Sequence, residues 1–76
     1  MKFKLIAEIV ETKPFRPFVV TTTTGDAYTV PHREHIFLPP SKTEILLYDE
    51  DMHFRIVDVR HVISVEPRRD SKTSRK

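Results

Sequence analysis

The chain has 76 residues, no cysteine and a formal net charge of +2, which limits it to one domain and excludes disulfides and thiolate chemistry. Charged residues interrupt the apolar positions of the first dozen residues, so they do not form a signal peptide. No apolar run approaches the roughly 20 residues that cross a bilayer, and we expect a cytoplasmic protein without membrane contacts.

Residues 2–12 predict a helix. Their apolar positions follow the i, i+3, i+4, i+7 spacing of a helix with one buried face: Phe3, Leu5, Ile6, Ile9 and Val10. Pro14 ends this helix, because proline disfavours helical backbone angles in the residue before it.

A β-hairpin follows. Residues 15–24 are rich in β-branched and aromatic side chains, which favour a strand. Gly25-Asp26 predicts a two-residue turn, and residues 27–30 predict the returning strand. Pro31 ends this strand, and the polar residues 32–35 predict a bend or a single helical turn.

Three further strands and a lid segment are predicted in the second half of the chain. Residues 36–38 indicate a short apolar strand or a lid, and the run at 45–48 indicates a strand buried on both faces. Residues 52–59 begin by alternating between apolar and polar side chains. After a short break at Arg60 and His61, residues 62–65 predict the last strand.

The predicted fold is mainly β, an N-terminal helix followed by a five-stranded, strongly bent antiparallel sheet that closes into a small barrel. Residues 1–66 form this single domain, with eight Lys or Arg against ten Asp or Glu. Residues 67–76 carry five basic residues and one acidic residue. We expect them to be a disordered basic tail, since they lack apolar periodicity.

The motif PFRPF at 14–18, a Gly/Asp turn and the segment 30–34 together resemble a family of short bacterial proteins of uncharacterised function. Those proteins share the pattern PFRPF…DG…V-x-HPEF and a later DLLLV-like segment, which corresponds here to residues 58–62. The resemblance covers roughly residues 5 to 66. Here Gly25-Asp26 reverses the usual turn order, Arg33 replaces a proline and His35 replaces an aromatic residue.

A more distant similarity links the helix and five strands to the Sm-like and SH3-like small barrels. Residues 56–65 are similar to the second Sm signature, in which an Arg-Gly pair contacts RNA bases. Arg60 matches the arginine, and His61 stands in place of the glycine. This resemblance implies RNA or DNA binding as an alternative function.

Several polar groups invite a chemical interpretation. His32 and His35 are three residues apart, which suits either a shared metal ion or local hydrogen bonds. Residues 49–53 gather three carboxylates and a histidine but lack the roughly 12-residue span of a calcium loop, so we expect a solvated turn. Arg16, placed between two Pro-Phe elements, either presents a rigid fork to a carboxylate or phosphate or stacks on Phe15 and pairs with an acidic residue.

No serine lies in a Gly-x-Ser-x-Gly elbow, and we expect neither catalysis nor a bound metal or cofactor. The sequence instead predicts a binding or adaptor domain that acts through protein–protein contacts, either with an unknown protein or by self-association through strand edges. Nucleic acid is the alternative partner. The residues expected to contact a partner or nucleic acid are Arg16, His32, Arg33, Arg60, His61, Arg68 and Arg69.

Overall fold

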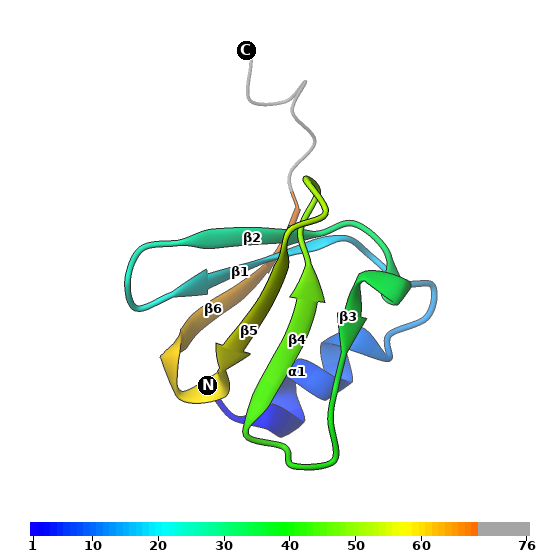
Figure 1. Cartoon of the computed structure of the whole chain (residues 1–76). Helices are drawn as coiled ribbons and strands as arrows, with labels where there is room; N and C mark the ends of the chain where they lie inside the picture. The colour runs from blue at the N-terminus through cyan, green and yellow to red at the C-terminus, as the bar shows by residue number, and fades with distance from the viewer. Residues whose placement is uncertain (69–76) are drawn as a thin grey trace.

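One helix and six strands form the fold in the computed structural model, which describes residues 1–68 (Figure 1). Two single-turn 3₁₀ helices, η1 and η2, interrupt the strands. The elements in chain order are α1 (Phe3–Val10), β1 (Phe18–Thr22), β2 (Ala27–Val30), η1 (Arg33–His35), β3 (Ile36–Phe37), β4 (Glu44–Tyr48), β5 (Phe54–Asp58), η2 (Val59–His61) and β6 (Val62–Pro67).

The strands form two separate antiparallel sheets, with strand orders β2-β1-β6 and β3-β4-β5. The prediction of one five-stranded barrel is therefore wrong. Within residues 1–68, no ladder joins β5 to β6 or β2 to β3. The connections β2–β3 and β5–β6 each contain a 3₁₀ turn. A closed barrel would need hydrogen-bonded pairing between the strands on both sides of these turns. The fold is a small α+β arrangement with a helix and two three-stranded sheets.

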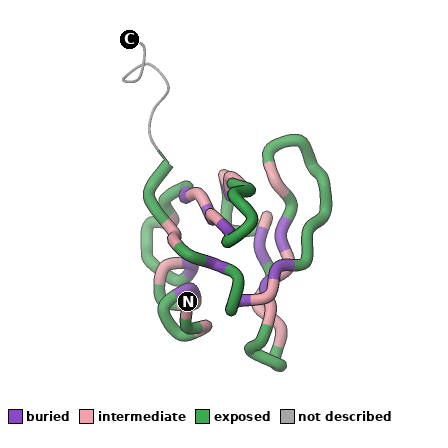
Figure 2. The backbone as a smooth tube through the Cα atoms, turned by 90° about the vertical axis from the view of Figure 1, so that its left-hand side faces the viewer, coloured by how far each residue is buried: buried purple, intermediate pink, exposed green. Residues whose placement is uncertain are grey.

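The core lies between the two sheets and α1. Strand β1 alternates strictly, with Phe18, Val20 and Thr22 buried and the residues between them partly exposed. The tube view shows the buried residues interspersed along the strand segments, whereas the loops are exposed (Figure 2). The buried apolar residues are Ile6, Val10, Phe18, Val20, Val30, Ile36, Ile45, Leu47, Val57, Val59 and Val62.

The N-terminal helix is present but shorter than predicted. It buries Ile6 and Val10, which are one turn apart on the same face, and it leaves Leu5 about half exposed. The α-amino group of Met1 donates hydrogen bonds of 3.0 Å to the carbonyls of Val59 and Val62. These bonds attach the start of the chain to η2 and β6.

The β1–β2 hairpin is confirmed, with a longer turn than the two residues predicted. Residues 23–26 connect the strands, and the Gly25 N–H donates to the Thr22 carbonyl at 2.9 Å. Gly25 has a φ of 90°, a left-handed conformation that favours glycine. The only glycine of the chain is thus placed where the turn needs it.

The last strand extends beyond the predicted residues 62–65. Strand β6 runs to Pro67, and the Arg68 N–H donates to the Pro17 carbonyl at 3.0 Å. The remainder of the predicted tail, residues 69–76, lies outside the described residues.

Candidate interaction surface

The outer face of the β3-β4-β5 sheet carries apolar side chains. Opposite residues in an antiparallel ladder point to the same face, and the register places Phe37, Leu46 and Ile56 in one row across the three strands. Tyr48 and Phe54 form the next row, with ring centroids 5.3 Å apart. We call these five residues the outer apolar face.

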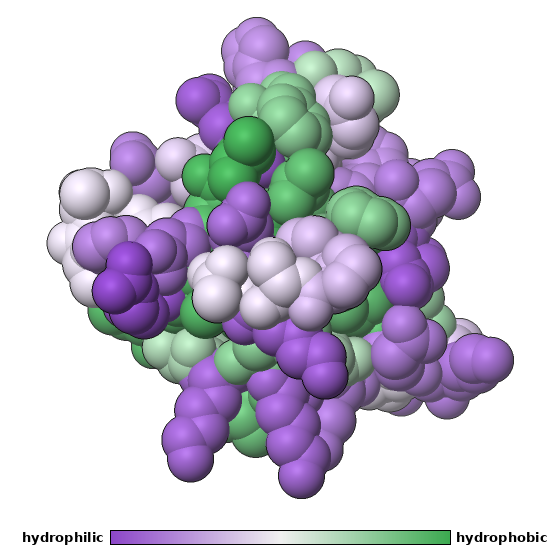
Figure 3. Space-filling model, turned by 60° about the horizontal axis from the view of Figure 1, so that its bottom comes forward, coloured by the Kyte–Doolittle hydropathy of each residue, from purple (hydrophilic) through white to green (hydrophobic). Residues whose placement is uncertain are grey.

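The outer apolar face is open to solvent. Phe37 is 58% exposed, Ile56 is 61% exposed and Phe54 is 48% exposed. In the space-filling view, apolar side chains gather over the sheet above the pale loop that joins β3 to β4 (Figure 3). A cluster of large apolar side chains on one face is a common mark of an interaction site, whereas single exposed residues are not.

Strand β4 was predicted to be buried on both faces, and the structure corrects this. Ile45 and Leu47 lie in the core, but Leu46 is only partly buried and Tyr48 is exposed. The alternation in β5 is real, but its apolar residues Phe54 and Ile56 face outwards. The register explains the reversal, because Val57 lies opposite Ile45 and occupies the core side.

Strand β5 is also an unpaired edge of its sheet within residues 1–68. Two backbone hydrogen bonds at the ends of the β4–β5 ladder show which residues of β5 bond to β4. The Val59 N–H donates to the Thr43 carbonyl, and the His53 carbonyl accepts from the Asp49 N–H. The odd-numbered residues of β5 therefore bond to β4. The backbone N–H and C=O groups of Phe54, Ile56 and Asp58 consequently point to the free edge.

A charged pair borders the outer apolar face. Arg60 donates from Nε and one Nη to the carboxylate of Asp58, with a shortest distance of 2.8 Å. These hydrogen bonds, together with the Arg60 backbone N–H, lower the pKa of Asp58 to about 2. The same carboxylate raises the pKa of Arg60.

The predicted nucleic-acid contacts at the turn between β5 and β6 are engaged within the protein. Arg60 is neutralised by Asp58, and His61 Nδ1 lies 3.4 Å from the Thr23 hydroxyl. Both side chains are held by local partners, so their geometry adds nothing in favour of base recognition. The Sm-like nucleic-acid function stays a prediction.

The remaining predicted site residues are scattered over the surface. Arg33 pairs with Glu11 at 3.0 Å and Arg68 pairs with Glu50 at 2.7 Å. His32 stacks obliquely on His35, with ring centroids 5.6 Å apart. The structure therefore does not gather these residues into one site, and Arg69 lies outside the described residues.

Two carboxylates and one histidine lie close together at the β4–β5 turn. Ligand atoms of Asp49, Asp51 and His53 lie within 4.8 Å of one another. The Asp49 carboxylate accepts the backbone N–H groups of Asp51 and His53, mainly the latter, which lowers its pKa. Asp49 thus already has a structural role in the turn. Among the described residues, His32 and His35 belong to no comparable cluster.

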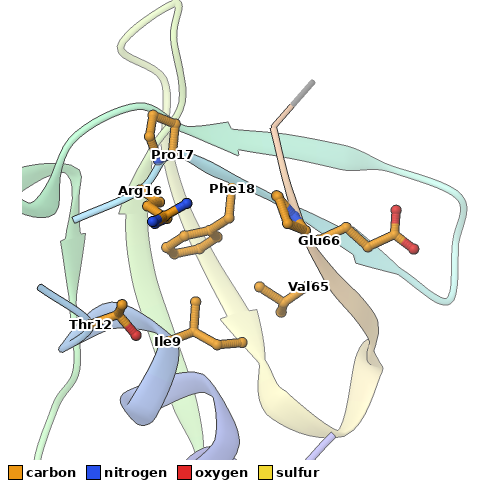
Figure 4. Close-up of a pocket in the computed structure, with 8 residues that line it drawn as sticks. Ile9, Thr12, Arg16, Pro17, Phe18, Val65 and Glu66 are labelled. Carbon is orange, nitrogen blue, oxygen red and sulfur yellow. The ribbon is translucent and has the colours of Figure 1, made fainter. Parts of the chain in front are cut away.

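A pocket of about 190 Å³ opens on the other side of the molecule, between the end of α1 and the β2-β1-β6 sheet (Figure 4). Its lining is mainly apolar. Arg16 is exposed and lies at the edge of this pocket, so this predicted residue lines a pocket. The lining residues are Ile9, Thr12, Arg16, Pro17, Phe18, Val65, Glu66 and Pro67.

Comparison with known proteins gives no relatives: no protein-family model, curated protein or solved structure matches the chain. The resemblance to short bacterial proteins therefore stays a prediction. Among residues 1–68, no helix has both the length and the apolar character needed to cross a membrane.

The sequence reasoning missed the outer apolar face, although a signal for it was present. The run Ile45–Tyr48 has more apolar residues than one buried face requires. A strand of this kind in a sheet with only one covered face leaves apolar side chains for a further contact.

Proposed function

We propose that this protein is a non-catalytic cytoplasmic binding module that acts through protein–protein contacts, and that it self-associates through the outer apolar face and the free edge of β5. The observation that carries the proposal is the continuity of these two features. Ile56 belongs to both, because its side chain lies on the face and its backbone groups point to the edge.

The backbone edge of β5 is open to pairing with a second copy, because its two charged residues, Arg55 and Asp58, already pair with Asp49 and Arg60 within the chain. Strand β5 contains no proline, and its first three residues, Phe54 to Ile56, are all exposed. Charges, prolines or bulges commonly block such edges, and an open apolar edge readily pairs with another strand. An antiparallel partner would continue the sheet and extend the outer apolar face across the interface.

Ile56→Lys tests the proposal, and Ile63→Lys is its matched control. Ile63 is 59% exposed, close to the 61% of Ile56, but it lies on β6 of the other sheet. We expect light scattering after size-exclusion chromatography to give a mass of at least two chains for the wild type at high concentration. Ile56→Lys should reduce this to one chain, whereas Ile63→Lys should not.

A single-chain mass for the wild type at high concentration would refute self-association. Equal masses for the wild type and Ile56→Lys, both above one chain, would refute the proposed surface. Circular dichroism of each variant confirms that it is folded before the masses are compared.

Ile56→Pro and Ile56→Ala separate the edge from the face. Both variants remove the isoleucine side chain, but only proline removes the N–H that points to the free edge. Proline is tolerated at such a position because the ladder to β4 does not use this N–H. If strands pair, Ile56→Pro should weaken association more than Ile56→Ala. Equal effects would contradict edge pairing and favour face-to-face packing.

A further inference from the structure

The pocket beside α1 contains an arginine without an acidic partner. Residues 1–68 include five arginines, and four of them form salt bridges to carboxylates. Arg16 is the exception within the described part of the chain, where its guanidinium also makes no side-chain hydrogen bond. The alternative predicted for Arg16, pairing with an acidic residue and stacking on Phe15, is absent from the contacts of these residues.

The side chains around Arg16 shape a cavity with one charged end. Figure 4 shows the guanidinium turned towards the side on which Phe18 and Val65 lie, whereas the Glu66 carboxylate turns away. Ile9 and Pro17 add further apolar wall. Phe18 is only 2% exposed, so the floor of the pocket reaches the core.

We infer that this pocket binds a carboxylate that carries one small apolar group, with Arg16 holding the carboxylate. A guanidinium offers two parallel N–H donors that match the two oxygens of a carboxylate. The apolar group of the ligand then contacts Ile9, Phe18 and Val65. The proposal concerns a different sheet from the outer apolar face and does not depend on self-association.

The size and charge of the pocket select this ligand class. A volume of about 190 Å³ equals roughly six water molecules at about 30 Å³ each, which is enough for a branched aliphatic group. The single guanidinium of Arg16 supplies one positive charge, which matches a monoanionic carboxylate better than a dianionic phosphate. The ligand chemistry is shared by free short-chain acids and by the C-terminal residue of a peptide.

The test is a ¹⁵N–¹H NMR titration of the full chain with 4-methylpentanoate. We expect saturable shifts of the Ile9, Thr12 and Val65 amides with a dissociation constant in about the millimolar range, since such a small ligand has few atoms to contribute. The neutral analogue 4-methylpentanamide should bind at least about tenfold more weakly, which corresponds to the loss of one charge-assisted hydrogen bond. Acetate and inorganic phosphate should produce no saturable shifts.

Arg16→Gln should weaken 4-methylpentanoate binding by about tenfold or more. Arg60→Gln is the matched control, because it removes an exposed arginine remote from the pocket and should leave binding unchanged. Unshifted resonances of β3 and of its neighbour β4 near Leu47 establish that both variants are folded, because these residues lie away from Arg16 and from the Arg60–Asp58 pair.

A second titration distinguishes the two sources of the ligand. The peptide acetyl-Gly-Gly-Leu with a free C-terminus should bind more tightly than 4-methylpentanoate if a peptide is the natural ligand, and more weakly if a free acid is. Its C-terminal amide should fail to bind in either case. The inference is overturned if no probe gives saturable shifts, if acid and amide bind equally, or if Arg16→Gln binds like the wild type.

Discussion

Ile45 and Ile56 are the same residue type on neighbouring strands, and their truncation should have very different consequences. Ile45 is fully buried on the core face of β4, whereas Ile56 is 61% exposed on the outer face of β5. Ile45→Val should cost about 0.5–1.5 kcal/mol and Ile45→Ala about 2–5 kcal/mol, because each leaves a cavity. Ile56→Val and Ile56→Ala should stay within about 0.5 kcal/mol, as exposed substitutions do.

The size of the domain makes these differences easy to measure. At about 0.05–0.15 kcal/mol per residue, 76 residues give a free energy of unfolding of about 4–11 kcal/mol. One kcal/mol moves the melting temperature of such a domain by about 4–8 °C. Ile45→Val should therefore melt about 2–12 °C lower, and Ile45→Ala should lose a large part of the total stability.

Thermal and urea unfolding followed by circular dichroism provide the measurement, at a protein concentration low enough to keep the chain monomeric. Similar urea m-values among the variants would show that only the free energy has changed. An equal loss for Ile56→Ala and Ile45→Ala at low concentration would refute the assignment of the two faces. A loss for Ile56→Ala that grows with protein concentration would instead support burial of Ile56 by a second copy.

Two further perturbations test the turn and the charged pair. Because hydrogen bonds from Arg60 lower the pKa of Asp58 from 3.8 to about 2 in the folded state, the ionised carboxylate favours folding above pH 4. This contribution is lost as the pH falls from about 4 to 2, so melting temperatures should fall less steeply over that range in Asp58→Asn than in the wild type; parallel pH profiles would contradict this role. Gly25→Ala should lower the melting temperature by about 4–8 °C, equivalent to about 1 kcal/mol, because Gly25 has a φ of 90°, which alanine adopts only with strain. No neighbouring atom lies within 4 Å of the added methyl group, so the whole loss comes from the backbone conformation. An unchanged melting temperature would refute this backbone argument.

Local sequence signals predicted the helix and the first hairpin because their causes are local. Pro14 prevents the helix from continuing, and Gly25 supplies the backbone angle of the turn. The β-branched residues between them restrict the side-chain torsion and favour an extended chain. None of these effects requires knowledge of a distant partner.

Sheet organisation could not be predicted in the same way. The short turns Arg33–His35 and Val59–His61 read as breaks within one sheet, but they carry the chain from one sheet to the other. Strand β6 therefore pairs with β1, at least 40 residues away, rather than with β5. Pairing over such a distance depends on the whole arrangement of the core and leaves little trace in a short stretch of sequence.

The candidate sites show the same limit. Four of the arginines look alike in the sequence as exposed cations, yet acidic neighbours brought close by the fold or the local turn neutralise them. Arg16 keeps its unusual setting between Pro-Phe elements, and the packing of α1 against the β2-β1-β6 sheet adds the apolar pocket. Its distinct environment was visible in the sequence, but its lack of an acidic partner within residues 1–68 was not.

By itself, the sequence determined where the chain is helical, where it is extended and where it turns, because proline, glycine and β-branched side chains restrict the backbone locally. Alternation also identified which residues share a face of a strand. Only the tertiary structure decided which face is buried, since Ile45 and Ile56 are the same residue type on neighbouring strands and differ in what covers them. The outer apolar face of β3-β4-β5 arises because α1 and the other sheet cover only one side of this sheet.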